Sequence, residues 1–243
     1  MRNRDPRRSM ARPLGRRGQK KKAYLYGSVT MGRELYLESY LEQQTARALD
    51  TDPRVRAFHP QPFCISLDDS AVYATQGSAF ASLPPVPLRY SSRGRDSHLL
   101  YTPDFLVELK RSSSLLVEVK EEEELAHLGK EMEQKDQAAK AAGYRLLVVT
   151  EKHVGQLGLE SNLATLRDAT QALRTQGVTL ELRQLEEAVA RSDGAFTWQQ
   201  LARDFPAHIL QMGIAGGVLG CELRRGMVGR ETPLWPAYGD LSH

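Results

Sequence analysis

The sequence has few residues of the kinds that hold a structural zinc ion. Cys64 and Cys221 are its only cysteines, and they lie far apart along the chain. The six histidines show no paired spacing such as HxxxH, so we do not expect a structural zinc site. Two isolated thiols are typical of proteins that work in a reducing cytosol.

The sequence also lacks a long hydrophobic run. Its longest weakly polar run, residues 209–221, is interrupted by glycines and is shorter than the roughly 20 residues of a membrane-spanning helix. The arginine-rich start is not followed by the apolar segment of a secretion signal. Residues 213–220 contain no GK[ST] and are therefore not a nucleotide-binding loop. We expect a cytoplasmic protein that makes no contact with a membrane.

Basic residues gather at the start of the 243-residue chain. Residues 1–22 contain ten Lys and Arg and one acidic residue, which leaves 23 basic and 29 acidic residues in the rest of the chain. The net charge of +3 therefore hides a net charge of −6 outside this segment. Such a composition buries little apolar area, so we predict a disordered basic tail over residues 1–22. The tail either adds salt-dependent affinity for nucleic acid or only keeps the chain soluble.

The hydrophobic pattern predicts an α/β core of at most three layers. Helical stripes alternate with apolar runs of strand length, and prolines at positions 53, 60 and 62 interrupt the pattern. A polar, serine-containing turn near residues 111–113 joins two strands into a hairpin. The expected elements, in order, are a helix over 32–49, short strands within 55–67, a surface excursion over 68–87, strands at 88–92 and 98–105, a hairpin over 104–120, a helix over 121–143 and a fully buried strand over 144–150.

The last helix of this core carries its own stabilising features. Four glutamates in its first turn face the positive end of the helix dipole. Glu131 and Lys135, like Asp136 and Lys140, are spaced i, i+4 and can form ion pairs. Gly143 is a typical stop signal after them.

The end of the chain predicts a small separate module. Residues 161–174 have a helical pattern, whereas residues 178–185 fit either a last strand or a connector. Thr197 can cap one helix and Pro206 can open another, and a glycine-bearing turn between two short strands follows. This order of elements fits a winged helix-turn-helix over residues 191–243.

Three charged side chains lie on the strands of the hairpin. Asp104 opens the first strand, and Glu118 and Lys120 lie two residues apart near the end of the second. Alternate side chains of a strand share a face, and the hairpin folds Asp104 back beside the other two. Mg²⁺ offsets the repulsion of close carboxylates and suits phosphodiester hydrolysis, in which Lys120 supplies an ammonium to counter charge in the transition state. Alternatively, Glu118 and Lys120 form a paired, solvent-facing surface of an edge strand.

An upstream glutamate is a further candidate. Glu34, Glu38 and Glu42 are spaced i, i+4, i+8 and form one acidic stripe on the helix expected over 32–49. Either solvent surrounds all three, or one of them extends the metal site. The pattern alone does not choose among them.

Several motifs follow one another in a characteristic order. They are ESYLE at 38–42, DPRV at 52–55, QP at 61–62, YTPDF at 101–105, EVK at 118–120 and YRLLVVTE at 144–151. Their order resembles TnsA, the endonuclease subunit of heteromeric transposases within the PD-(D/E)XK nuclease superfamily, and the resemblance runs from about Met31 to Trp235. Gln43 and Gln44 depart from the charged pair usual in that family, and the excursion over 68–97 is longer than expected.

The resemblance implies a restriction-endonuclease-like core and assigns the site. It makes Glu42 the helix glutamate, Asp104 the central metal ligand, Glu118 the second ligand and Lys120 the lysine that orients or activates water. Together with Val119, the three acidic residues form the implied ligand set for two Mg²⁺ ions, which Mn²⁺ can replace.

The resemblance also implies a function and a domain plan. The enzyme cuts the 5′, non-transferred strands at transposon ends, together with a DDE-type transposase that cuts and joins the 3′ ends and an ATP-dependent transposition regulator, in a prokaryotic cytoplasm and on DNA. A stand-alone restriction or repair nuclease and an inactive DNA-binding scaffold subunit are the alternatives. The expected parts are a tail over 1–22, a nuclease domain over 23–153, a connecting segment over 154–190 and the winged-helix-like module over 191–243.

Overall fold

The computed structural model describes residues 11, 23–82, 100–192 and 194–237. The tail expected over residues 1–22, apart from Ala11, lies outside the described residues, as do the strand expected at 88–92 and the second half of the 68–97 excursion. None of the helices in the described ranges combines the length and the apolarity needed to cross a bilayer.

The contacts divide the chain into two compact units. The first comprises Met1–Gly27, Glu34–Gln43 and Ala57–Glu151, and the second comprises Ser28–Arg33, Gln44–Arg56 and Lys152–His243. The chain leaves the first unit for good after Glu151, close to the expected end of the nuclease domain at 153. The domain boundaries expected from the sequence stay predictions.

The first unit contains a mixed four-stranded sheet. Its strands are β3 (Val55–Pro60), β7 (Phe105–Leu109), β8 (Leu115–Val119) and β9 (Arg145–Val149), hydrogen-bonded in the order β3-β7-β8-β9. The pair β7 and β8 is the expected antiparallel hairpin, whereas β9 runs parallel to β8. A parallel pair needs a crossover connection, and α3 (Glu122–Leu125) and α4 (Gly129–Ala141) supply it. The mixed sheet with its helices is consistent with a nuclease-like core.

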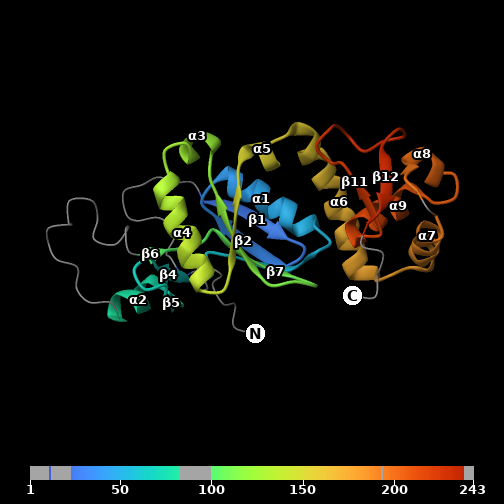
Figure 1. Ribbon diagram of the computed structural model, residues 1–243. Helices are drawn as coiled ribbons and strands as arrows, with labels where there is room; N and C mark the ends of the chain where they lie inside the picture. Colours follow the sequence, from blue (N-terminus) through green and yellow to red (C-terminus); the bar gives the residue numbers. More distant parts are fainter. Residues whose placement is uncertain (1–10, 12–22, 83–99, 193, 238–243) are drawn as a thin grey trace. The chain divides into compact units, whose positions relative to one another are not determined.

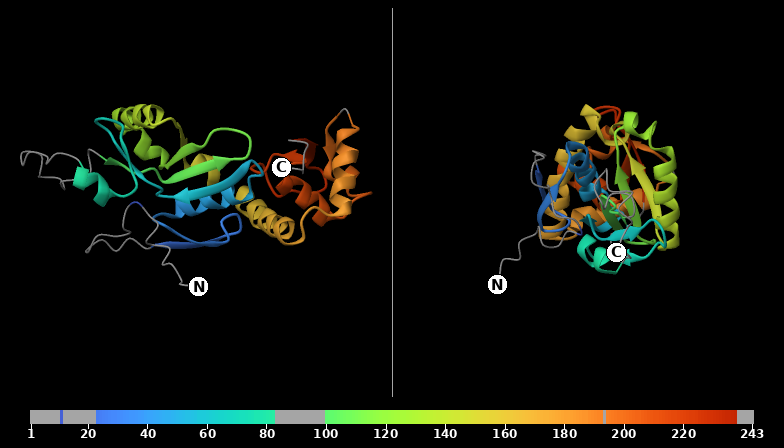
Figure 2. Two further views of the ribbon diagram at one scale, coloured as in Figure 1. Left: turned by 90° about the horizontal axis from the view of Figure 1, so that it is seen from below. Right: turned by 90° about the vertical axis from the view of Figure 1, so that its left-hand side faces the viewer.

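One face of this sheet packs against α4, which Figure 1 and the left view of Figure 2 show alongside the green strands. Ala138 and Ala139 are buried there against Leu116 of β8, because small side chains let the helix approach the sheet closely. The expected i, i+4 ion pairs form, and the positive φ of Gly143 (+87°) turns the chain from α4 into β9.

Two smaller sheets complete the first group of strands. One contains β4 (Cys64–Ser66), β5 (Val72–Tyr73) and β6 (Leu100–Tyr101) in the order β5-β4-β6, with α2 (Gln76–Ser82) close by. The other pairs β1 (Tyr24–Ser28) with β2 (Arg33–Leu37). The described half of the expected surface excursion therefore contains a short strand and a helix.

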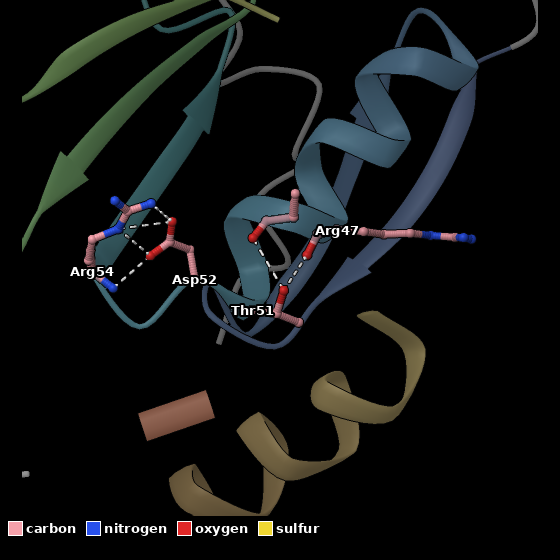
Figure 3. Close-up of polar contacts among 5 residues, drawn as sticks. Arg47, Thr51, Asp52 and Arg54 are labelled. Carbon is pink, nitrogen blue, oxygen red and sulfur yellow. Dashed lines mark hydrogen bonds and ion pairs between the residues drawn. The ribbon is translucent and has the colours of Figure 1, made fainter. Parts of the chain in front are cut away.

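The turn after α1 (Tyr40–Thr51) is held by local polar contacts, which Figure 3 shows. The hydroxyl of Thr51 donates to the main-chain oxygens of Arg47 and Ala48 in the last turn of the helix. Asp52 accepts from the main-chain N–H of Arg54 at 2.9 Å and also forms an ion pair with its guanidinium. These contacts turn the chain from the helix into β3.

The second unit has a helical core with a small antiparallel sheet. Its helices are α5 (Glu151–Val154), α6 (Leu157–Gln176), α7 (Leu180–Ala190), α8 (Trp198–Leu201) and α9 (Ala207–Gly216), and its strands are β10 (Phe196–Thr197), β11 (Leu219–Cys221) and β12 (Pro233–Pro236). The sheet has the order β10-β12-β11. Side chains from α6, α7, α9, β11 and β12 share one buried cluster. Thr197 caps α8 and Pro206 precedes α9, as expected.

The helix expected over residues 32–49 is wrong in its first part, where β2 stands instead. Leu35 and Leu37 are buried and alternate with more exposed neighbours. This period of two fits a strand, and the same leucines also fall on a helical stripe, so the local pattern was ambiguous. Pairing with β1 decided the outcome.

Three further sequence predictions need correction. The helix over 121–143 is interrupted between α3 and α4, where main-chain bonds of i→i+3 spacing form and Gly129 begins the second helix. The strand over 144–150 is not fully buried, because β9 ends the strand order of its sheet and Leu147 is 49% exposed. Residues 178–185 contribute to the helix α7, whose start is capped by the Thr179 hydroxyl, rather than to a strand.

Candidate active site

The register of the β7–β8 hairpin brings Asp104 and Glu118 together. Phe105 pairs with Val117, so the next position along the ladder sets Asp104 opposite Glu118. Asp104 Oδ2 accepts a 2.7 Å hydrogen bond from the main-chain N–H of Val119. The two carboxylates interact electrostatically, which agrees with a common face at one end of the sheet.

The pKa of Asp104 reflects this environment. Removal from water raises the pKa well above the ordinary value of 3.8, and the negative charges of Glu118 and Glu42 raise it further. The ammonium of Lys120 and the N–H of Val119 act in the opposite direction but do not prevail. A cation close to the two carboxylates favours the charged form of Asp104.

Lys120 lies where the strand periodicity predicted it, on the same face as Glu118. Its Nζ is 3.1 Å from Glu118 Oε1 and also donates to the main-chain oxygen of Val119 at 3.2 Å. Burial opposes the charged form, but the negative charges of Glu118 and Asp104 outweigh it and raise the pKa of Lys120. Lys120 is therefore an ammonium group fixed beside the carboxylate pair.

A second lysine, which lies outside the sequence motifs of the site, reaches it from α4. Lys135 Nζ lies 2.9 Å from Glu118 Oε1 and 2.8 Å from Glu131 Oε1, and it stands 5.3 Å from the ring centroid of Tyr101. Lys135 shares the buried face of α4 with Ala138 and Ala139, three and four residues further on. This spacing along the helix is the sequence feature that could have indicated that Lys135 faces the sheet.

The chemistry of Glu118 fits a bound cation. Its side chain is 3% exposed, and its Oε2 has no hydrogen-bond partner among the described residues. A buried carboxylate oxygen without a partner is costly, and a hard divalent ion beside Asp104 and Glu118 would satisfy it. No group of three His, Cys, Asp or Glu side chains in the described ranges stands close enough to hold a metal ion, so the fit rests on this pair of carboxylates.

Glu42, the expected third ligand, lies in the first turn of α1. Its Oε2 accepts from the main-chain N–H of Glu38 at 2.9 Å, and its Oε1 accepts from the Ser39 hydroxyl at 3.1 Å. Glu34 lies on β2 and Glu38 precedes the helix, so the expected stripe of three glutamates on one helix does not form. Of these three glutamates, Glu42 is the one that is buried and whose charge raises the pKa of Asp104.

The candidate site lies mostly within one segment that resembles known proteins. Residues 52–151 match the family model described as TnsA-like endonuclease, N terminal. Over this segment the chain is similar to TnsA-like endonucleases. The match confirms the resemblance seen in the sequence over residues 52–151. No match to the chain was found among curated proteins.

The TnsA-like domain contains both carboxylates of the pair and both lysines. Asp104, Glu118, Lys120 and Lys135 fall inside the matched segment, whereas Glu42 lies before it. The family is one of endonucleases, which implies nuclease activity for this domain.

Proposed function

We propose that this chain is the endonuclease subunit of a heteromeric transposase and that it cuts the 5′, non-transferred strands at transposon ends. The TnsA-like domain supports the reaction class. The observation that carries the proposal is the meeting of Asp104, Glu118 and Lys120 at one end of the β7–β8 hairpin inside that domain. Such a group is suited to phosphodiester hydrolysis.

We further propose the role of each group. Asp104 and Glu118 hold Mg²⁺, with the main-chain oxygen of Val119 and the carboxylate of Glu42 as additional ligands. Bound Mg²⁺ lowers the pKa of the attacking water and offsets charge on the phosphate, and Mn²⁺ can serve in its place. Lys120, fixed by Glu118, orients the attacking water or stabilises a phosphate oxygen. Glu42 has to exchange its contacts with Ser39 and the Glu38 N–H in order to bind an ion.

The second unit supports the proposal of a winged-helix module. The order β10, α8, α9, β11, β12, with β12 between the other two strands, resembles that of such a module. Most of α9 is buried and the helix carries no Lys or Arg, so contacts with DNA phosphates fall to the loop between β11 and β12, which carries Arg224, Arg225 and Arg230.

The loop between β11 and β12 is anchored to α6. The Asn162 side chain donates to the main-chain oxygens of Leu223 and Gly226 and accepts from the N–H of Val228. Gly158 lies against Gly226, where a side chain would crowd the main chain. The arginines of the loop are therefore held by a fixed main chain, which supports a binding role for this module on DNA.

The decisive experiment uses DNA that carries both transposon ends, with and without the partner DDE-type transposase and the ATP-dependent regulator, in Mg²⁺ or EDTA. We expect partner-dependent nicking of the 5′ strands in Mg²⁺, lost in Asp104→Ala and Lys120→Ala. Lys140→Ala is the matched control, because Lys140 is exposed on α4 and pairs only locally with Asp136. Vigorous cleavage by the chain alone would instead identify a stand-alone nuclease. Binding without cleavage would identify an inactive scaffold subunit.

A further inference from the structure

Two ammonium groups converge on a single oxygen of Glu118, although the ExK motif contains only one lysine. Lys120 Nζ and Lys135 Nζ lie 3.1 Å and 2.9 Å from Oε1. The other oxygen, Oε2, is buried and has no hydrogen-bond partner in the described part of the chain. The lysines therefore hold Glu118 at Oε1. Its Oε2 makes no hydrogen bond of ordinary geometry, although the buried Tyr101 hydroxyl also interacts with this carboxylate.

The burial of the Lys135 ammonium costs solvation free energy, and neighbouring side chains offset that cost. Its side chain is only 11% exposed, whereas that of Lys140, five residues later on the same helix, is 67% exposed. Removing an ammonium from water is unfavourable unless nearby groups replace its hydration. Glu118, Glu131 and the face of the Tyr101 ring do so. A long, flexible side chain that could reach solvent is instead directed into the site.

Two ammonium groups and two carboxyl groups meet at the centre of the site. Lys120 and Lys135 both contact Glu118. Lys120 also interacts with Asp104, whereas Glu131 is half exposed and so is screened by water. A divalent ion that enters this group meets two ammonium charges as well as two carboxylates. The site therefore binds the ion less tightly than the same two carboxylates would if Lys120 were the only lysine beside them.

We propose that Lys135 is the resident counter-cation of Glu118: it holds this carboxylate in position before a divalent ion binds, and it weakens the binding of that ion. The inference rests on the function proposed above, and it makes Lys135 a positioning residue. Phosphate oxygens of bound DNA add the negative charge that restores metal affinity. Metal loading is thereby linked to the presence of DNA.

The test measures the binding of Mn²⁺ alone to the full chain by calorimetry, together with thermal unfolding in EDTA and in saturating Mn²⁺. Lys135→Met should bind Mn²⁺ with a Kd about tenfold lower than the unmodified chain, which corresponds to about 1.4 kcal/mol. Its Tm should fall in EDTA and recover in Mn²⁺. Lys135→Arg keeps the charge and should keep the unmodified Kd, as should Lys140→Met, the control on the exposed face of α4.

A purely structural role for Lys135 predicts a different result. The inference is overturned if Lys135→Met binds Mn²⁺ no more tightly than the unmodified chain, or if its loss of Tm is the same with and without Mn²⁺. If Lys135→Met does not fold in EDTA, circular dichroism during a Mn²⁺ titration shows whether the ion restores the fold. Recovery of helical signal supports the inference, and its absence contradicts it.

Asp104→Ala separates this inference from the proposed function. If the unmodified chain and Asp104→Ala bind Mn²⁺ equally, the carboxylate pair is not a metal site and both ideas fail. If Asp104→Ala abolishes Mn²⁺ binding while Lys135→Met binds it like the unmodified chain, the metal site stands and only the role of Lys135 is refuted.

Discussion

Asp50, near the end of α1, offers the sharpest test of what holds the second unit together. Its side chain is 2% exposed and ties the turn between β1 and β2 to the helix. Oδ1 accepts from the Ser28 hydroxyl and from the Thr30 N–H, each at 2.7 Å, and Oδ2 accepts from the Val29 N–H at 2.8 Å. Asp50→Ala leaves all three donors without this partner.

The expected loss follows from these three bonds. A buried donor left unsatisfied costs about 1–3 kcal/mol, and Thr30 is only partly buried, so water can replace part of its lost bond. The free energy of unfolding should therefore fall by about 3–5 kcal/mol in Asp50→Ala. Asp50→Asn keeps one acceptor oxygen and should lose about half as much.

Urea unfolding followed by circular dichroism measures these differences. Asp52→Ala is the matched control, because Asp52 also accepts from a neighbouring main-chain N–H but pairs with the exposed Arg54 (Figure 3). Its loss should be about 0–1 kcal/mol. A loss in Asp50→Ala no greater than that of Asp52→Ala would refute the reasoning.

Two further predictions concern the candidate site. Burial and the charges of Glu118 and Glu42 raise the pKa of Asp104 in the folded state. The contribution of Asp104 to stability is therefore fully present below the ordinary pKa of 3.8, and it is lost as the pH rises through the raised pKa. In EDTA, the Tm of Asp104→Asn should therefore increasingly exceed that of the unmodified chain as pH rises above 3.8, and a constant difference would contradict this. In the cleavage assay, Glu42→Ala should abolish product while Glu38→Ala, which keeps the main-chain donor to Glu42, should retain it. Equal activity of the two variants would remove Glu42 from the site.

Local patterns predicted the hairpin and the motif residues well. Glu118 and Lys120 were expected to share a face because they lie two residues apart on a strand, and their 3.1 Å contact confirms this. The i, i+4 pairs of α4 were predicted for the same reason, since a helix brings those positions together whatever surrounds it. Such contacts depend on a few neighbouring residues.

Other features were ambiguous in the sequence because two periods fitted the same residues. Leu35 and Leu37 match a strand and a helical stripe equally, and only pairing with β1 selected the strand. Residues 178–185 likewise combine β-prone and helix-prone side chains, and burial of Leu182 and Leu185 in the shared cluster of the second unit accompanies the helix. Tertiary packing overrides a weak local preference in such cases.

The sequence by itself determined the carboxylate pair, because a short turn fixes the register of two strands and sets Asp104 opposite Glu118. Only the tertiary structure decided the second cation, since Lys135 lies 17 residues from Glu118 and meets it where α4 crosses the face of β8. The spacing of residues along α4 shows which side chains share a face of the helix. It does not show which strand residue that face will cover, because the packing of the helix on the sheet sets this contact.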